Sequence, residues 1–234
     1  MDATAAVERR QPRETAMQRL ARHTGEFATA FARLLMLASL LTPLLLVSFL
    51  TIDLPMRALD GLVGSETLLR PSNWLSRGGF LMAFAPLIAI LFARKYGGDE
   101  ASRVVTASWG LAAIAVFAEL SYLAPALEDG DMPPVRFTVV FVASAMAAQY
   151  FAASAYDILR GGVRWWRAPL VAALSSYGVW AIIYFPAVYW GTGAPWLNWM
   201  VSDFAIKTVI AVAFLPIYVM LKKSLRPRGG FGGV

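Results

Sequence analysis

The residues best placed to do chemistry are an aspartate and a lysine in the last long apolar stretch. Asp203 and Lys207 stand four residues apart, between Trp199 and an apolar run that ends at Leu221. On a helix this spacing puts both side chains on one face, where a carboxylate and an ammonium can pair. Charged groups at membrane depth are energetically expensive and commonly mark a binding site or a polar pathway. The pair therefore predicts a polar site, with one alternative left open: Lys207 lies near the helix end and extends its ammonium to the lipid headgroups.

Two further polar residues lie inside apolar stretches. Gln149 lies in the middle of the stretch Phe137–Leu159, where its amide needs a partner on another helix or on a planar solute. Glu119 lies near the end of its own stretch. It is a candidate for proton or cation binding if it faces the other helices, and otherwise its carboxylate reaches the outer interface. The candidate substrate-binding residues are therefore Asp203, Lys207, Gln149 and Glu119.

The composition indicates that an all-α membrane protein positions these residues. The chain is 58% hydrophobic and only 15% charged, with a mean hydropathy of +0.57. Six apolar stretches of roughly 18–24 residues are each long enough to cross a hydrocarbon core of about 30 Å as a helix. The predicted membrane spans are Phe31–Ile52, Leu75–Phe92, Val104–Ala124, Phe137–Leu159, Trp166–Tyr189 and Trp199–Leu221.

Three prolines predict bends within spans, and the longest connection has room for a short helix. Pro86, Pro186 and Pro216 lie inside the second, fifth and sixth spans, where they predict bends that either line a cavity or serve packing. The loop between the first two spans is the longest connection, and its stretch Met56–Leu69 has the length of a short interfacial helix.

The distribution of basic residues predicts the orientation. Sixteen lysines and arginines fall on the side of both termini and four fall on the other side. Basic residues gather on the cytoplasmic side of a membrane protein, so we expect both termini in the cytoplasm. Residues 1–28 are expected to be a basic cytoplasmic tail, disordered or alternatively a short amphipathic helix, 29–223 the six-helix domain and 224–234 a flexible tail rich in Gly and Arg.

The chain also lacks the residues that several function classes need. It has no cysteine, and its one histidine is His23 in the basic tail, which excludes disulfides, thiolate metal sites and a bis-histidine haem. It contains no P-loop, no G-x-S-x-G and no H-E-x-x-H sequence. We therefore expect no enzyme activity and no cofactor. The net charge of +6 follows from the topology and does not indicate nucleic acid.

Several sequence features resemble one transporter family. The last span combines Trp199, Asp203 and Lys207 with a later Phe-Leu-Pro-x-Tyr sequence that ends at Tyr218. This pattern resembles the closing helix of the queuosine precursor transporters, also known as the vitamin uptake transporter-like (VUT) family. The Arg-Trp-Trp-x-Ala-Pro sequence that begins at Arg164 is similar to the family's junction between its fourth and fifth helices. The chain thus resembles a diverged member of this family.

The resemblance implies an inner-membrane importer of 7-deazaguanine precursors such as preQ0 or preQ1, with a bundle similar to vitamin-uptake S-components. Asp203 and Lys207 match the family's acidic and basic positions in the last helix, and Gln149 matches its glutamine in the fourth helix. Other polar positions of the family are replaced here, so the substrate is expected to be altered. The replacing residues are Ile90, Arg94, Ala152 and Trp180.

Two functions from different classes therefore remain. The first is a small-molecule transporter with a small planar substrate. The second is a non-transporting structural or assembly subunit, with the lipid bilayer and either a second copy or a membrane complex as its partners. A polar cavity around Lys207 would favour the transporter, whereas a bundle filled by its own side chains would favour the subunit.

Overall fold

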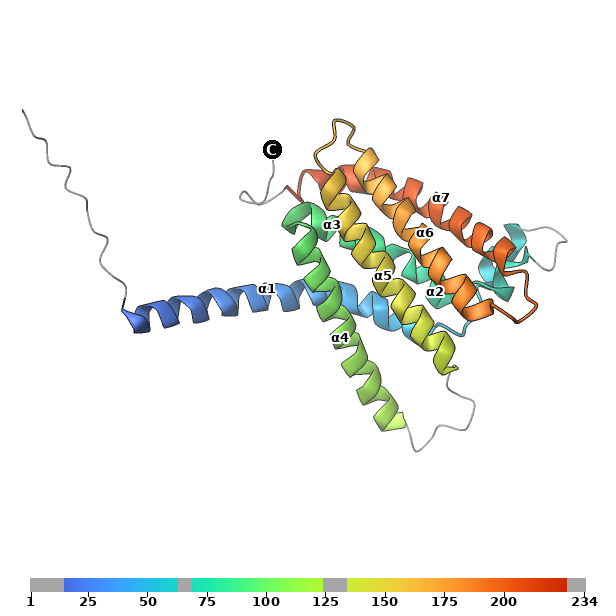
Figure 1. Cartoon of the computed structure of the whole chain (residues 1–234), viewed down its shortest axis with the longest axis horizontal. Helices are drawn as coiled ribbons and strands as arrows, with labels where there is room; N and C mark the ends of the chain where they lie inside the picture. Colours follow the sequence, from blue (N-terminus) through green and yellow to red (C-terminus); the bar gives the residue numbers. More distant parts are fainter. Residues whose placement is uncertain (1–14, 63–68, 124–133, 227–234) are drawn as a thin grey trace, which may run out of the picture.

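The computed structural model describes residues 15–62, 69–123 and 134–226, which form a helical bundle (Figure 1). Six helical segments in these ranges are long and apolar enough to cross a membrane, and α2 and α3 together make the second of them. The predicted all-α fold with six spans is therefore confirmed, while the orientation stays a prediction. The helices are α1 (Ala16–Leu50), α2 (Arg77–Met82), α3 (Phe84–Tyr96), α4 (Gly98–Leu123), α5 (Val135–Leu159), α6 (Arg167–Tyr189) and α7 (Trp196–Lys222).

The first helix begins much earlier than the sequence analysis predicts. Thr15 and Gln18 form a capping box, in which the Thr15 hydroxyl accepts from the Gln18 N–H and the Gln18 side chain accepts from the Thr15 N–H. The expected tail is thus helical from Ala16, and residues 1–14 lie outside the described ranges. The N-terminal half of α1 extends away from the other helices (Figure 1).

Helices α3, α5, α6 and α7 run side by side (Figure 1). Helix α5 packs most extensively on α6 and also contacts α3 and α4, whereas α7 packs on α6 and touches α3 only lightly. Close approach of α5 and α6 is possible because alanines line their buried faces, including Ala152 and Ala173. Helix α1 crosses α4, and the C-terminal half of α4 projects from the bundle.

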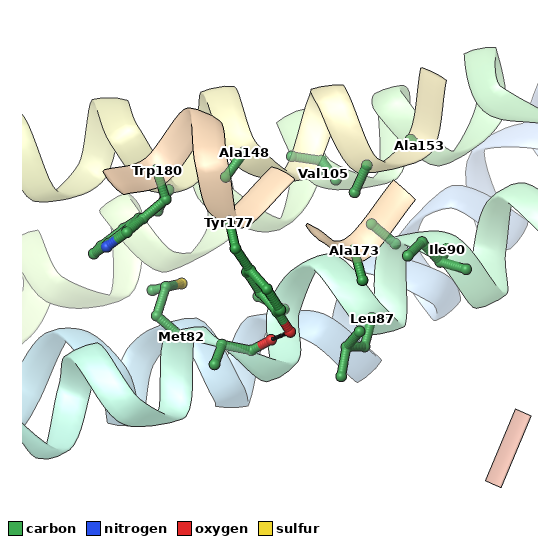
Figure 2. Close-up of a cluster of buried hydrophobic side chains, with 14 of the residues drawn as sticks. Met82, Leu87, Ile90, Val105, Ala148, Ala153, Ala173, Tyr177 and Trp180 are labelled. Carbon is green, nitrogen blue, oxygen red and sulfur yellow. Dashed lines mark hydrogen bonds between the residues drawn. The ribbon is translucent and has the colours of Figure 1, made fainter. Parts of the chain in front are cut away.

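The second span is broken between α2 and α3 at Ala83. Pro86 has no N–H to donate to the fourth residue before it, so the regular hydrogen-bond ladder is interrupted here. The Tyr177 hydroxyl from α6 donates to the Ala83 carbonyl at 2.7 Å, so a buried side chain binds the backbone at the break (Figure 2). The proline predicted to bend this span therefore has a structural consequence beside the centre of the bundle.

A short and a long connection join the helices at the two ends of the bundle. Gly97 ends α3 with φ 93°, a conformation that glycine adopts easily, and α4 follows at once with Asp99 and Glu100 in its first turn. This is why α4 starts at Gly98, earlier than predicted. At the other end, the region expected to hold an interfacial helix has a 3₁₀ turn at Arg57–Leu62, and residues 63–68 lie outside the described ranges.

Candidate functional site

The aspartate and lysine of α7 form an ion pair buried inside the bundle. The Lys207 Nζ donates to Asp203 Oδ2 at 2.7 Å, and each side chain is only 3% exposed. The alternative in which Lys207 reaches the headgroups is therefore wrong for this structure. Two charges in a dry interior are stable only when they are paired closely, so neither group can lose its partner without a large energetic cost.

The Lys207 ammonium also lies against an aromatic ring from α6. Its Nζ is 4.4 Å from the centroid of the Trp180 ring, within the range of a cation–π interaction. Trp180 in turn stacks on Tyr184 at 4.9 Å between ring centroids and meets Phe141 edge-on at 5.2 Å. These contacts fix the indole plane beside the ion pair, where it offers a flat apolar face.

A very small cavity borders this arrangement. Its volume is about 10 Å³, which is room for about one water molecule. Figure 2 shows Met82, Tyr177, Trp180 and Ala148 in this region. In this state the interior is closed, and a solute with a ring system would need the helices to separate. The cavity is lined by Met82, Ala83, Pro86, Ala145, Ala148, Tyr177, Trp180 and Lys207.

Gln149 lies one side chain away from this cavity. It is fully buried, its Oε1 accepts from the Trp109 Nε1 at 3.3 Å, and its Nε2 donates to the Met82 sulfur at 3.7 Å. A thioether is a weak acceptor, so the amide makes only one strong hydrogen bond here. Gln149 does not line the cavity, and Met82, which does, lies against its amide.

Glu119 is not part of this group. It lies on the projecting half of α4, and its side chain is exposed. The exposed side chain is inconsistent with the alternative in which Glu119 faces the other helices, while the alternative in which its carboxylate reaches the outer interface stays a prediction. The inclusion of Glu119 among the residues around Lys207 is thus corrected, because α4 diverges from the bundle before it reaches Glu119 (Figure 1).

A cluster at the end of α3, named here the tyrosine latch, closes one end of the interior. It consists of Arg94, Tyr156 and Tyr218, which come from α3, α5 and α7. The Arg94 guanidinium donates to the Tyr156 hydroxyl at 3.2 Å and to the Tyr218 hydroxyl at 2.9 Å, and the two hydroxyls lie 2.8 Å apart. Arg94 also donates to the Lys222 carbonyl at 3.2 Å. These hydrogen bonds therefore connect the end of α7 to α3 and α5, which α7 otherwise contacts little.

Aromatic rings in edge-to-face and stacked contact lie toward the opposite end, and they are named here the aromatic cap. Tyr184 and Phe185 meet at 5.3 Å between ring centroids, Phe185 stacks on Tyr189 at 6.0 Å, and Tyr189 meets Trp199 at 5.2 Å. Along α7 the cap residue Trp199 precedes Asp203, and the latch residue Tyr218 follows Lys207. The ion pair thus lies between the aromatic cap and the tyrosine latch along α7.

The four replaced family positions fall into two groups. Ile90 and Ala152 are fully buried in the apolar core, and Figure 2 shows Ile90 there. Arg94 and Trp180 instead make the specific contacts of the latch and of the ion pair. The sequence analysis treated these two positions only as losses of polar groups, because their new contacts are made between helices distant in the chain.

Comparison with protein families gives one match for this chain. The model of a family described as "Putative vitamin uptake transporter" matches residues 76–221, which is more than half of the chain and runs from α2 to the last turn of α7. Comparison with curated proteins and with solved structures gives no match.

Proposed function

The chain belongs to the vitamin uptake transporter family, and from that premise we propose that it imports a small planar solute of the 7-deazaguanine type, such as preQ0 or preQ1. The proposed location is a bacterial inner membrane with both termini in the cytoplasm, which the bias of basic residues supports. The buried Asp203–Lys207 pair is the observation that carries the proposal, because an ion pair inside a transporter bundle has no need to be there for stability alone.

The chemistry of the pair matches one edge of a deazaguanine ring. That edge presents two adjacent N–H donors beside a carbonyl oxygen. A carboxylate accepts two N–H bonds side by side, and a neighbouring ammonium donates to a carbonyl. Asp203 and Lys207 offer these two groups 2.7 Å apart, and the solute edge would replace part of their mutual contact. The Trp180 face, now over Lys207, would stack on the flat ring.

Entry of the solute requires a change from the closed state. The cavity of about 10 Å³ is far below the roughly 300–1,000 Å³ of typical ligand pockets. Helix α7 carries both charged residues, packs mainly on α6 and touches α3 only lightly, so a movement of α7 away from α3 would open the site without breaking the extensive contact of α5 with α6. Opening at the aromatic cap and at the tyrosine latch in turn would give alternating access.

Binding to the purified full-length chain in mild detergent tests this proposal. We expect preQ1 and preQ0 to raise the melting temperature of the wild type, since a ligand at 100 times its Kd stabilises by about 2.7 kcal/mol. Hypoxanthine, which lacks the exocyclic amino group, should have a much smaller effect. Asp203→Asn should lose the preQ1 effect relative to its own ligand-free protein.

A matched control comes from an exposed ion pair with the same spacing. Glu26 pairs with Arg22 on the extended part of α1, with the Glu26 side chain 64% exposed, and Glu26→Gln should respond to preQ1 as the wild type does. An equal response of Asp203→Asn and wild type would reject the site. The absence of any response to either deazaguanine would reject the substrate class.

The filled interior favours a second candidate function. A bundle in which the cavity beside Lys207 holds about one water is also what a non-transporting structural or assembly subunit would have. Such a subunit would co-purify with a membrane partner in mild detergent and would show no ligand response. The binding experiment and a mass analysis of the same preparation therefore distinguish the two functions.

A further inference from the structure

The structure has a second cavity, larger and more polar, away from the ion pair. It has a volume of about 240 Å³ and lies where α1 passes the junction of α3 and α4 and the end of α5. None of the candidate substrate-binding residues lines it. A volume of this size is below that of typical pockets for drug-sized ligands, so it suits a small polar group. Its charged lining residues are Arg33, Lys95, Asp99, Glu100, Arg103, Asp157 and Arg160.

The charges of this lining leave an excess of cations. Arg103 pairs with Glu100 at 3.5 Å and Arg160 pairs with Asp157 at 3.2 Å, so these four residues largely neutralise each other. Arg33, Lys95 and Asp99 remain, which leaves one net positive charge. The two cationic side chains are half-buried, with the Lys95 Nζ 5.3 Å from the ring centroid of Tyr96, and Asp99 is exposed. Partly buried cations call for an anionic partner, because their charge is only partly solvated.

The surroundings of Arg33 indicate the kind of anion. Arg33 lies in the apolar part of α1, and the nearby Phe31, Leu35 and Met36 are exposed large apolar side chains. The cavity also lies on the side that carries sixteen of the chain's basic residues, which is the proposed cytoplasmic side. A polar cavity beside an apolar, exposed helix face can take a phosphate with acyl chains attached, whereas a soluble anion would make no use of that face.

We propose that this cavity binds the headgroup of an anionic phospholipid of the inner leaflet, with Arg33 and Lys95 as the counter-charges of its phosphate. The acyl chains would lie along the exposed apolar face of α1. Basic cavities between transmembrane helices on the cytoplasmic side are known to suit such headgroups. The lipid would join α1 to the end of α3 and the start of α4, and so would hold the extended first helix against the bundle.

Binding of short-chain phosphatidylglycerol to the delipidated full-length protein tests this proposal, with thermal stabilisation as the readout. Two basic residues near an anionic headgroup contribute about a thirtyfold gain in affinity together. We therefore expect Arg33→Gln/Lys95→Gln to bind about thirtyfold more weakly than the wild type. The charge-retaining Arg33→Lys/Lys95→Arg should bind within about threefold of it.

Controls separate the cavity from general charge and from a soluble anion. Arg164→Gln/Lys223→Gln removes the same charge from exposed positions outside the cavity and should bind like the wild type. Inorganic phosphate should stabilise far less than the lipid. Equal binding by the cavity variant and the wild type would overturn the proposal, and an equal effect of inorganic phosphate would overturn its lipid source. If the double variant aggregates, the single variants Arg33→Gln and Lys95→Gln replace it, each expected to bind about fivefold more weakly.

Discussion

Neutralising the buried aspartate has the most sharply defined consequence for stability. Asp203→Asn keeps the shape of the side chain but leaves the Lys207 ammonium buried with a neutral neighbour. At a separation of 2.7 Å and an effective dielectric constant of about 20, the attraction between the two charges is about 6 kcal/mol. Much of that attraction offsets the cost of taking both charges out of water, so the net loss is smaller.

The structure also limits how large this loss can be. Removing one partner of a buried ion pair typically costs about 3–5 kcal/mol. The variant retains the contact of Lys207 with Trp180, and a desolvated cation–π interaction contributes about 2 kcal/mol. We therefore expect Asp203→Asn to lower the free energy of unfolding by about 3 kcal/mol, near the lower end of that range.

Equilibrium unfolding by SDS in mixed micelles, followed by tryptophan fluorescence, measures this loss. The double variant Asp203→Leu/Lys207→Met should return to within about 1 kcal/mol of the wild type, because it leaves no unpaired charge. The exposed pair gives the matched control: Glu26→Gln should change stability by less than about 1 kcal/mol. A loss below about 1 kcal/mol for Asp203→Asn would mean that water reaches the pair. A double variant as unstable as the single one would refute the unpaired charge as the cause.

Three further substitutions test the elements that hold the site. Arg94→Leu should open the tyrosine latch, which can be measured with Ala211→Cys as a single reactive thiol in the otherwise cysteine-free chain. The thiol should react with an aqueous reagent much faster in Arg94→Leu/Ala211→Cys than in Ala211→Cys alone. Tyr177→Phe should destabilise by about 1–3 kcal/mol, because the carbonyl at the helix break loses its buried donor. Gly78→Ala should destabilise by about 1–3 kcal/mol in the same unfolding assay, because a Cβ there would collide with the backbone of α1. Gly110→Ala, which meets no atom within 4 Å, should be neutral or stabilising.

The sequence predicted the spans well because hydropathy and length act locally. Six apolar stretches became six spans, and the i, i+4 spacing of Asp203 and Lys207 led directly to an ion pair. The start of α1 was missed because its signal is a capping box in a polar segment, which hydropathy does not detect. Likewise α4 begins before its apolar run, since acidic residues stabilise the first turn.

Contacts between distant helices could not be read from the sequence. Whether Glu119 faces the bundle depends on the angle at which α4 crosses its neighbours, and no local pattern fixes that angle. The latch residues Arg94 and Tyr218 are 124 positions apart in the chain, so only the folded arrangement brings them together. The same holds for Trp180 and Lys207, whose ring and ammonium meet across α6 and α7.

The most direct test of the central claim is uptake of radiolabelled preQ1 by cells that lack their own transporter and precursor synthesis. We predict uptake with the wild-type chain, loss of uptake with Lys207→Ala at unchanged membrane expression, and normal uptake with the exposed control Lys223→Ala. Uptake that survives Lys207→Ala would contradict the assigned site. A well-expressed wild type that takes up neither preQ1 nor preQ0 would contradict the assignment as a deazaguanine transporter.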